Sequence, residues 1–202
     1  MFKINRVFIV CLTIAFSILI SSVVAIASSN YYYDNGYATG GQKLTANYWK
    51  DSSVSSYGWG SLSDIGAAAW NGISSKIGSS AVTSEPVYYS AVVYAGSSIS
   101  GMSVYAYTDY YTYGLFGWSQ VSQDSTRDRS RIRIDNTNMV ELGVTTDGYK
   151  KQKDVMIHEF GHVFSLKHND IDADSVMKAT ALTTYGAPTA SDKQHLKEKW
   201  GN

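Results

Sequence analysis

The sequence has 202 residues, with 17 basic and 17 acidic side chains, so its formal net charge is zero at pH 7. A chain without a strong net charge has no long-range field that recruits nucleic acid or anionic lipid, so neither is expected as a partner. Its single cysteine, Cys11, excludes an internal disulfide, and the core and any bound metal must therefore stabilise the fold.

Residues 1–27 have the features of a secretory signal peptide. Two basic residues precede an uncharged run from Val7 to Ala27, which ends in Ala-Ile-Ala, the small-residue pattern of a cleavage site. An uncleaved membrane anchor is the alternative, because the run meets the roughly 20 residues that span a bilayer. Cleavage leaves 15 of the 17 basic residues against 17 acidic ones, a net charge of −2. We therefore expect a secreted, extracellular protein that begins near Ser28, with no membrane contact after cleavage.

The next part of the chain predicts an arm, two strands and a helix. Residues 28–41 are rich in Tyr, Asn and Gly without periodicity, which indicates an extended N-terminal arm. Residues 42–50 alternate between apolar and polar side chains and predict a strand. A Ser/Gly loop over 52–60 leads to apolar residues at helical spacing, which predict a serine-capped helix over 61–77. Residues 87–95 are nearly all apolar or aromatic, as in a strand buried on both faces.

The middle of the chain predicts further strands separated by loops. Residues 102–111 alternate and predict a strand, whereas two glycines interrupt 112–121, which fits an edge strand or a bulged segment. A polar loop over 123–130 precedes a short alternating strand over 131–135. Residues 136–149 have no clear period and are expected to form a loop.

The last element is a C-terminal helix. Ser191 and Gln194 form a capping box, and the apolar pair four residues apart at Leu196 and Trp200 precedes a terminating Gly201. We interpret His195, the one histidine outside the motif described next, as a surface residue of this helix. We find no internal repeat and no second domain, and expect a monomer.

A helix predicted from about residue 150 carries the segment HEFGHVFSLKH, which begins at His158. His158 and His162 are four residues apart and therefore lie on the same helical face. His168 can join them only if the chain reverses sharply after His162. Three neutral imidazoles with an open fourth position are the ligand set of a catalytic zinc site. Glu159 lies beside the ion without binding it, where a carboxylate can act as general base.

This segment resembles the HExxHxxGxxH pattern of the metzincin zinc metallopeptidases. Asp174–Lys178, DSVMK, resembles their Met-turn, with Met177 as the methionine beneath the metal. The closest likeness is to the matrixin-type catalytic domain, over residues 42–202. The resemblance implies an α+β, zincin-like fold: a twisted, mostly parallel five-stranded sheet backed by two helices, with a small C-terminal subdomain and helix.

The same resemblance implies a secreted zinc-dependent endopeptidase that cleaves a protein or peptide substrate. One catalytic Zn²⁺ would be held by His158, His162 and His168, and Glu159 would polarise the attacking water. The segment 183–188 would wall the specificity pocket, and an edge strand within 112–121 would pair with the substrate backbone. Calcium is suggested by the family alone, because the sequence has no calcium-binding motif.

One departure keeps a second function open. The family's motif glycine is Ser165 here, and serine adopts the left-handed conformation only at a cost of ~1–2 kcal/mol. The alternative is a secreted binding or adhesion protein on the same scaffold, with zinc kept for structure or the site decayed. Asp170, Asp172 and Asp174 follow the third histidine, where they either orient a ligand ring or solvate a loop.

Overall fold

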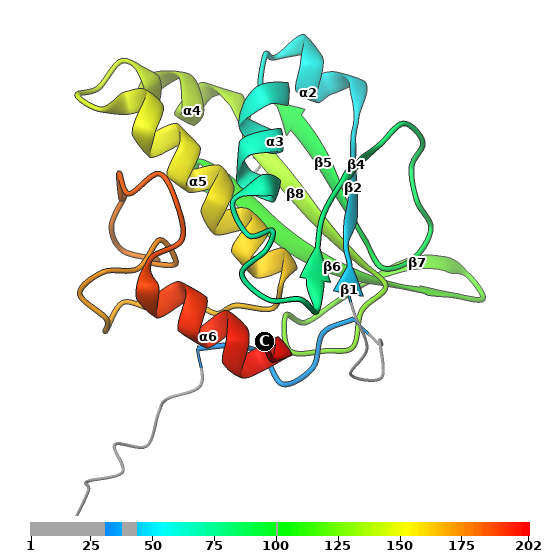
Figure 1. The fold of residues 1–202 in the computed structure, drawn as a ribbon. Helices are drawn as coiled ribbons and strands as arrows, with labels where there is room; N and C mark the ends of the chain where they lie inside the picture. Colours follow the sequence, from blue (N-terminus) through cyan, green and yellow to red (C-terminus); the bar gives the residue numbers. More distant parts are fainter. Residues whose placement is uncertain (1–30, 38–43, 100) are drawn as a thin grey trace, which may run out of the picture. The chain divides into compact units, whose positions relative to one another are not determined.

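The computed structural model in Figure 1 describes residues 31–37, 44–99 and 101–202. The signal peptide predicted over 1–27, with either of its two interpretations, lies outside the described residues, as do both ends of the predicted arm. In the described ranges, no helix combines the length and the apolar character that crossing a membrane requires.

A six-stranded mixed sheet forms the centre of the fold, in the order β4-β2-β5-β8-β6-β7. Its strands are β2 (Asn47–Lys50), β4 (Ala81–Val82), β5 (Ser90–Gly96), β6 (Ala106–Gly114), β7 (Gly117–Val121) and β8 (Arg129–Asp135). The first four strands in this order are parallel, whereas β6 is antiparallel to both β8 and β7. A separate parallel pair joins β1 (Leu44–Thr45) to β3 (Ile77–Gly78).

The predicted fold class, a zincin-like and mostly parallel five-stranded sheet, is therefore wrong. The sheet has six strands, and two of its five pairings are antiparallel. Alternation of side chains along a strand reveals which residues share a face but carries no information on strand direction. The two-residue turn between Gly114 and Gly117 joins β6 and β7 as a hairpin, which fixes the antiparallel edge that was missed.

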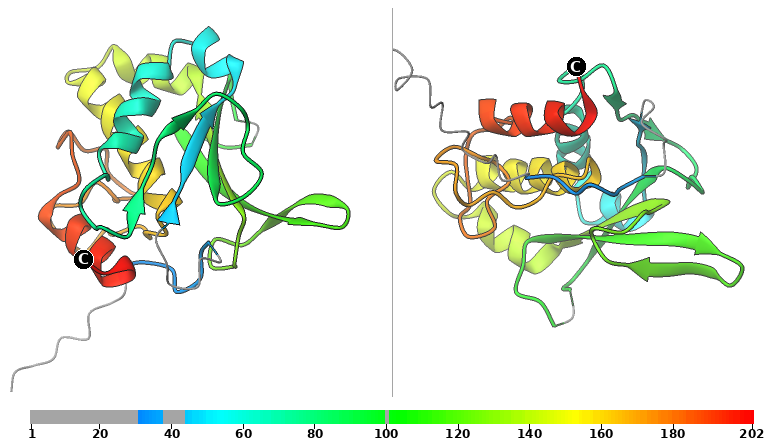
Figure 2. Two further views of the ribbon diagram at one scale, coloured as in Figure 1. Left: turned by 45° about the vertical axis from the view of Figure 1, so that its right-hand side comes forward. Right: turned by 90° about the horizontal axis from the view of Figure 1, so that it is seen from below.

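Two helices, α3 (Gly60–Ala68) and α5 (Gly148–Val163), pack against one face of the sheet (Figures 1 and 2). The Phe160 ring of α5 meets the Tyr48 ring of β2 edge-on, with centroids 5.4 Å apart. The two helices approach closely, because a Cβ added at Gly66 would lie 2.7 Å from the carbonyl oxygen of Met156. The core between helices and sheet therefore anchors α5, the helix that carries the histidine motif.

The strands were predicted better than the helices. Ala91, Val92 and Val93 of β5 are fully buried, as predicted for a strand covered on both faces, and Ile132 and Ile134 of β8 point into the core. Chain 112–121 is not one edge strand: it contains the end of β6, a turn, and β7, which forms the edge of the sheet.

Short capped helices were mistaken for loops. The carboxylate of Asp51 accepts from Ser53 N at the start of α2 (Ser52–Ser56), and that of Asp135 accepts from Asn138 N at the start of α4 (Asn136–Gly143). Both helices are shorter than the window in which helical periodicity becomes visible. Local side-chain caps, rather than an apolar stripe, mark these two elements in the sequence.

Two helix ends also differ from the prediction. The helix expected to reach residue 77 ends at Ala68, because the Asn71 side chain pairs with the backbone of Ser79 and holds the following turn against β3 and β4. The C-terminal helix α6 (Ala190–Trp200) begins two residues earlier than expected. Its capping box consists of Thr189 and Asp192 rather than Ser191 and Gln194.

Candidate metal centre

Helix α5 presents His158 and His162 on one side and buries its other side in the core. Met156, Phe160 and Val163 are fully buried, so the helix has a fixed rotation about its axis. A Cβ added at Gly161 would lie 2.3 Å from Met177 Sδ. Only glycine fits there, and the segment resembling a Met-turn therefore packs directly on the helix between its two histidines.

The chain reverses after α5 as the motif requires. Ser165 has φ = 71°, the left-handed conformation that terminates helices. Its N–H donates to His162 O, and the Leu166 N–H donates to Gly161 O at 3.0 Å each. Ser165 therefore adopts the geometry of the glycine it replaces and turns the chain toward His168.

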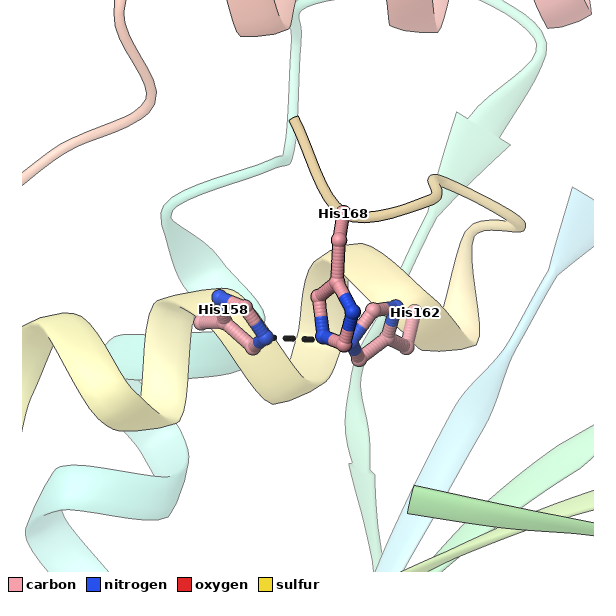
Figure 3. Close-up of side chains that lie close together, drawn as sticks. All are labelled: His158, His162 and His168. Atoms are coloured by element: carbon pink, nitrogen blue, oxygen red, sulfur yellow. Dashed lines mark hydrogen bonds between the residues drawn. The ribbon is translucent and has the colours of Figure 1, made fainter. Parts of the chain in front are cut away.

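The turn brings the three predicted imidazoles together (Figure 3). The Nε2 atom of His162 lies 3.0 Å from that of His158 and 3.1 Å from that of His168. In the described part of the chain, these residues are the one group of three or more His, Cys, Asp or Glu whose potential ligand atoms converge.

The hydrogen bonds of the rings assign their tautomers. The Nδ1 atoms of His158 and His162 lie 2.8 Å from the carbonyl oxygens of Val176 and Leu166, which can only accept, so each Nδ1 carries a proton. Burial lowers the pKa of His158 to about 4 and that of His162 well below its usual value, so both rings are neutral near pH 7. Their Nε2 atoms then carry lone pairs that face each other.

Facing lone pairs at this distance repel unless a cation lies between them. Tetrahedral zinc with Zn–N bonds of about 2.0–2.1 Å separates its ligand nitrogens by roughly 3.3 Å. The observed separations of 3.0 and 3.1 Å are close to this value. With all three potential ligand atoms within 4.8 Å of one another, His158, His162 and His168 are the residues that would hold one zinc ion.

Glu159 follows His158 in α5 and its buried side chain contacts the sheet. The hydroxyl of Thr108 in β6 donates a hydrogen bond of 2.5 Å to one carboxylate oxygen of Glu159, Oε2. Burial raises the pKa of Glu159 to about 7, and the hydrogen bond from Thr108 opposes that rise. Thr108 thus orients the carboxylate from a strand that sequence reasoning did not connect to the motif.

Arg127 holds the end of α5 and was not predicted. It is fully buried, and its Nη2 donates to the carbonyls of His162 and Val163 and to the Ser165 hydroxyl. Its guanidinium also lies 4.3 Å from the Tyr110 ring centroid and 5.0 Å from that of Tyr37. A cation at the C-terminal end of a helix is favourable, so Arg127 stabilises both the helix end and the turn.

The described part of the N-terminal arm packs on the same turn. Tyr33 N–H donates to Ser165 O, and Lys167 N–H donates to Tyr31 O, each at 2.8 Å. A Cβ added at Gly36 would lie 2.6 Å from the Ser165 hydroxyl oxygen. The tyrosine-rich arm is therefore a second support for the backbone reversal.

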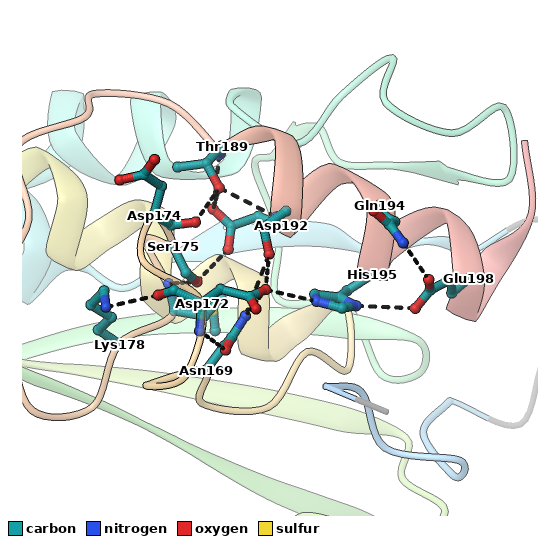
Figure 4. Close-up of polar contacts among 12 residues, drawn as sticks. Asn169, Asp172, Asp174, Ser175, Lys178, Thr189, Asp192, Gln194, His195 and Glu198 are labelled. Carbon is teal, nitrogen blue, oxygen red and sulfur yellow. Dashed lines mark hydrogen bonds and ion pairs between the residues drawn. The ribbon is translucent and has the colours of Figure 1, made fainter. Parts of the chain in front are cut away.

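Buried aspartates fix the segments around the rings (Figure 4). The Asp192 carboxylate accepts from Ser175 Oγ at 2.5 Å and from Val176 N at 3.0 Å, and Val176 O in turn accepts from His158. Asp154 of α5 accepts from the hydroxyl of Thr183 and from the backbone of Tyr185 and Gly186, which pins the predicted pocket wall to the helix.

The acidic residues after the third histidine accept hydrogen bonds from neighbouring loop residues. Asp170 accepts from the backbone of Ala179 and Thr180, and Asp172 accepts from Asn169 Nδ2. The interpretation of His195 as a surface residue is wrong, because it is only 8% exposed. Its two ring nitrogens bind the carboxylates of Asp172 and Glu198 separately, as Figure 4 shows, so these groups do not converge on one ion.

No protein-family model and no curated protein matches the sequence. Among solved structures, the chain is similar to a chain in the GM1-bound form of the ECX AB5 holotoxin. The TM-score is 0.53 at 13% sequence identity, over 84% of this chain and 86% of that chain. At this identity the likeness is one of fold. The correction of the zincin-like architecture that the motif implied rests on the sheet order and strand directions given above.

Proposed function

We propose that the protein is a secreted zinc-dependent endopeptidase. The observation that carries the proposal is the convergence of three imidazoles, through Nε2 atoms 3.0 and 3.1 Å apart, on a helix that carries the buried carboxylate of Glu159 directly after the first of them. The motif from His158 to Met177 resembles that of the metzincins, which supports the same reaction class. Zinc-dependent hydrolysis uses a Lewis acid together with a general base, and this chain offers ligands for the first and a residue for the second.

A zinc ion held by His158, His162 and His168 would polarise the scissile carbonyl and make water a stronger nucleophile near neutral pH. Glu159 accepts the proton of the attacking water and delivers it to the leaving amine. Thr108 donates to Oε2 of this carboxylate, which leaves Oε1 as the oxygen proposed to take the proton. The carbonyls of Val176 and Leu166 hold two of the rings in orientation and keep their lone pairs on Nε2.

The substrate backbone is best accommodated along β6 rather than within 112–121. Residues 110–114 of β6 pair with β7, whereas Ala106–Asp109 pair with β8 on one side and lack β7 on the other. Thr108, in this singly paired part, reaches Glu159. An extended peptide that adds to this stretch would therefore pass beside the carboxylate and the imidazoles.

Cleavage of unfolded casein by the purified protein tests the proposal, with Glu159→Gln as the matched variant. We expect chelator-sensitive fragments from the wild type and none from the variant, which should still bind one zinc per chain. Cleavage by Glu159→Gln at the wild-type rate would exclude the proposed base. Bound zinc without any cleavage would instead favour the alternative, a secreted binding protein that keeps the metal for structure.

A further inference from the structure

The β6–β7 hairpin ends in two large apolar side chains that contact almost nothing. Leu115 is 94% exposed and Phe116 is 98% exposed, at a turn between two glycines. In Figure 2 this hairpin projects away from the helices and the rest of the sheet. Single exposed apolar residues are common on protein surfaces, but two adjacent, fully exposed ones at a projecting tip require an explanation.

Aromatic rings with polar groups lie directly behind the tip. Tyr113 and Trp118 face each other across the hairpin with ring centroids 5.0 Å apart. Tyr88 meets the Tyr113 ring edge-on at 6.0 Å, and Tyr89 adjoins Tyr88 at 6.4 Å. Tyrosine and tryptophan combine an apolar ring with a hydrogen-bonding group, the combination found where proteins meet the headgroup level of a membrane.

The surroundings of the tip are uncharged. Residues 112–121 and 86–99 contain no Asp, Glu, Lys or Arg. The ionic groups at the base of the hairpin are engaged: Arg129 pairs with Glu85 and stacks on Trp118, and Asp128 accepts from Thr112 and Tyr113. A surface of this kind fits a neutral interface and offers nothing to anionic headgroups.

From these observations we propose that the hairpin tip inserts into a lipid surface with neutral headgroups, which revises the expectation of no membrane contact after signal-peptide cleavage. Leu115 and Phe116 enter the acyl region, and the rings of Tyr113, Trp118 and Tyr88 lie at headgroup level. A second copy of the chain fits less well, because two side chains offer roughly 400 Å², half of the ~800 Å² per partner that a stable dimer buries. Insertion needs only the tip and does not depend on the zinc chemistry.

Flotation with phosphatidylcholine vesicles tests the proposal. The wild type, Leu115→Ser/Phe116→Ser and the control Ile171→Ser are compared as secreted proteins whose N-termini have been sequenced. Ile171 is also highly exposed, at 79%, but lies in the loop after the third histidine. We expect the double variant to bind at least about 100-fold more weakly, because two large apolar side chains no longer leave water on insertion, whereas the control binds like the wild type.

Several results would overturn the proposal. These are no flotation of the wild type, equal flotation of the double variant, or flotation only with phosphatidylserine present and only at low salt. A dimer in gel filtration that the double variant abolishes, without vesicle binding, would assign the tip to a second copy instead. Circular dichroism and urea unfolding check that the double variant is folded, and the single variant Phe116→Ser repeats the test with a smaller change.

Discussion

Ser165 offers a direct test of how the backbone reversal is stabilised. It has φ = 71°, where glycine is strain-free, yet its buried hydroxyl accepts from Arg127 Nη2 at 2.9 Å. Two substitutions separate these effects. Ser165→Ala removes the hydrogen bond and keeps the backbone strain, whereas Ser165→Gly removes both.

These contacts predict the order of the free energies of unfolding of the wild type and the two variants. A hydrogen bond to a charged group contributes about 1.5–3 kcal/mol, so Ser165→Ala should lower the free energy of unfolding by about 2 kcal/mol. Replacing Ser165 by glycine relieves the left-handed strain, which raises the free energy of unfolding by ~1–2 kcal/mol. It also increases the entropy of the unfolded chain, which lowers the free energy of unfolding by roughly 0.4–1 kcal/mol. Ser165→Gly should therefore lie about 1–1.5 kcal/mol below the wild type and above Ser165→Ala.

Urea unfolding of the three metal-free proteins measures this order, with equal m-values as the check that the unfolded states are comparable. A glycine variant at least as stable as the wild type would refute the claim that the Arg127 bond outweighs the strain. An alanine variant as stable as the glycine variant would show that the left-handed strain is no larger than the roughly 0.4–1 kcal/mol that glycine loses through the entropy of its unfolded chain.

Further predictions concern the support of the ring cluster. Arg127→Met should cost about 3 kcal/mol or more in urea unfolding, because two buried carbonyls and a hydroxyl lose their donor. The control Lys150→Met removes a cation whose side chain is 60% exposed and pairs with the exposed Asp147, and it should cost far less. Thr108→Val should lower kcat about 10-fold, the loss of one hydrogen bond, while zinc content stays at one per chain; an unchanged kcat would remove Thr108 from the site. Zinc at 100 times its Kd should raise the unfolding free energy of the wild type by about 2.7 kcal/mol. The gain at the same zinc concentration should be smaller in His168→Ala, which keeps two imidazole ligands, and should vanish after chelation.

The sequence located the ring cluster because its residues are close in the chain. His158 and His162 share a helical face by period alone, and His168 follows within a single turn. The conformation of Ser165 was the uncertain step, and it depends on Arg127 and the tyrosine-rich arm, both far away in sequence. Long-range supports of this kind leave no periodic signal, so neither Arg127 nor Thr108 could be found from the sequence.

The sheet shows which features of a strand the sequence pattern predicts and which it does not. Continuous apolar character identified β5, and alternation identified the inward residues of β8, because both follow from burial. Neither pattern reports strand direction, and the predicted parallel sheet was wrong at the hairpin edge. The same hairpin carries Leu115 and Phe116, whose exposure could not be inferred from an apolar stretch that fits an edge strand equally well.

X-ray absorption at the zinc edge, on protein purified with one equivalent of zinc, tests the central claim most directly. The account predicts three imidazole nitrogens at about 2.0–2.1 Å and one oxygen ligand, with His168→Ala showing one imidazole fewer. Zinc that is lost on dialysis, or that the wild type binds through two imidazoles or fewer, would contradict it.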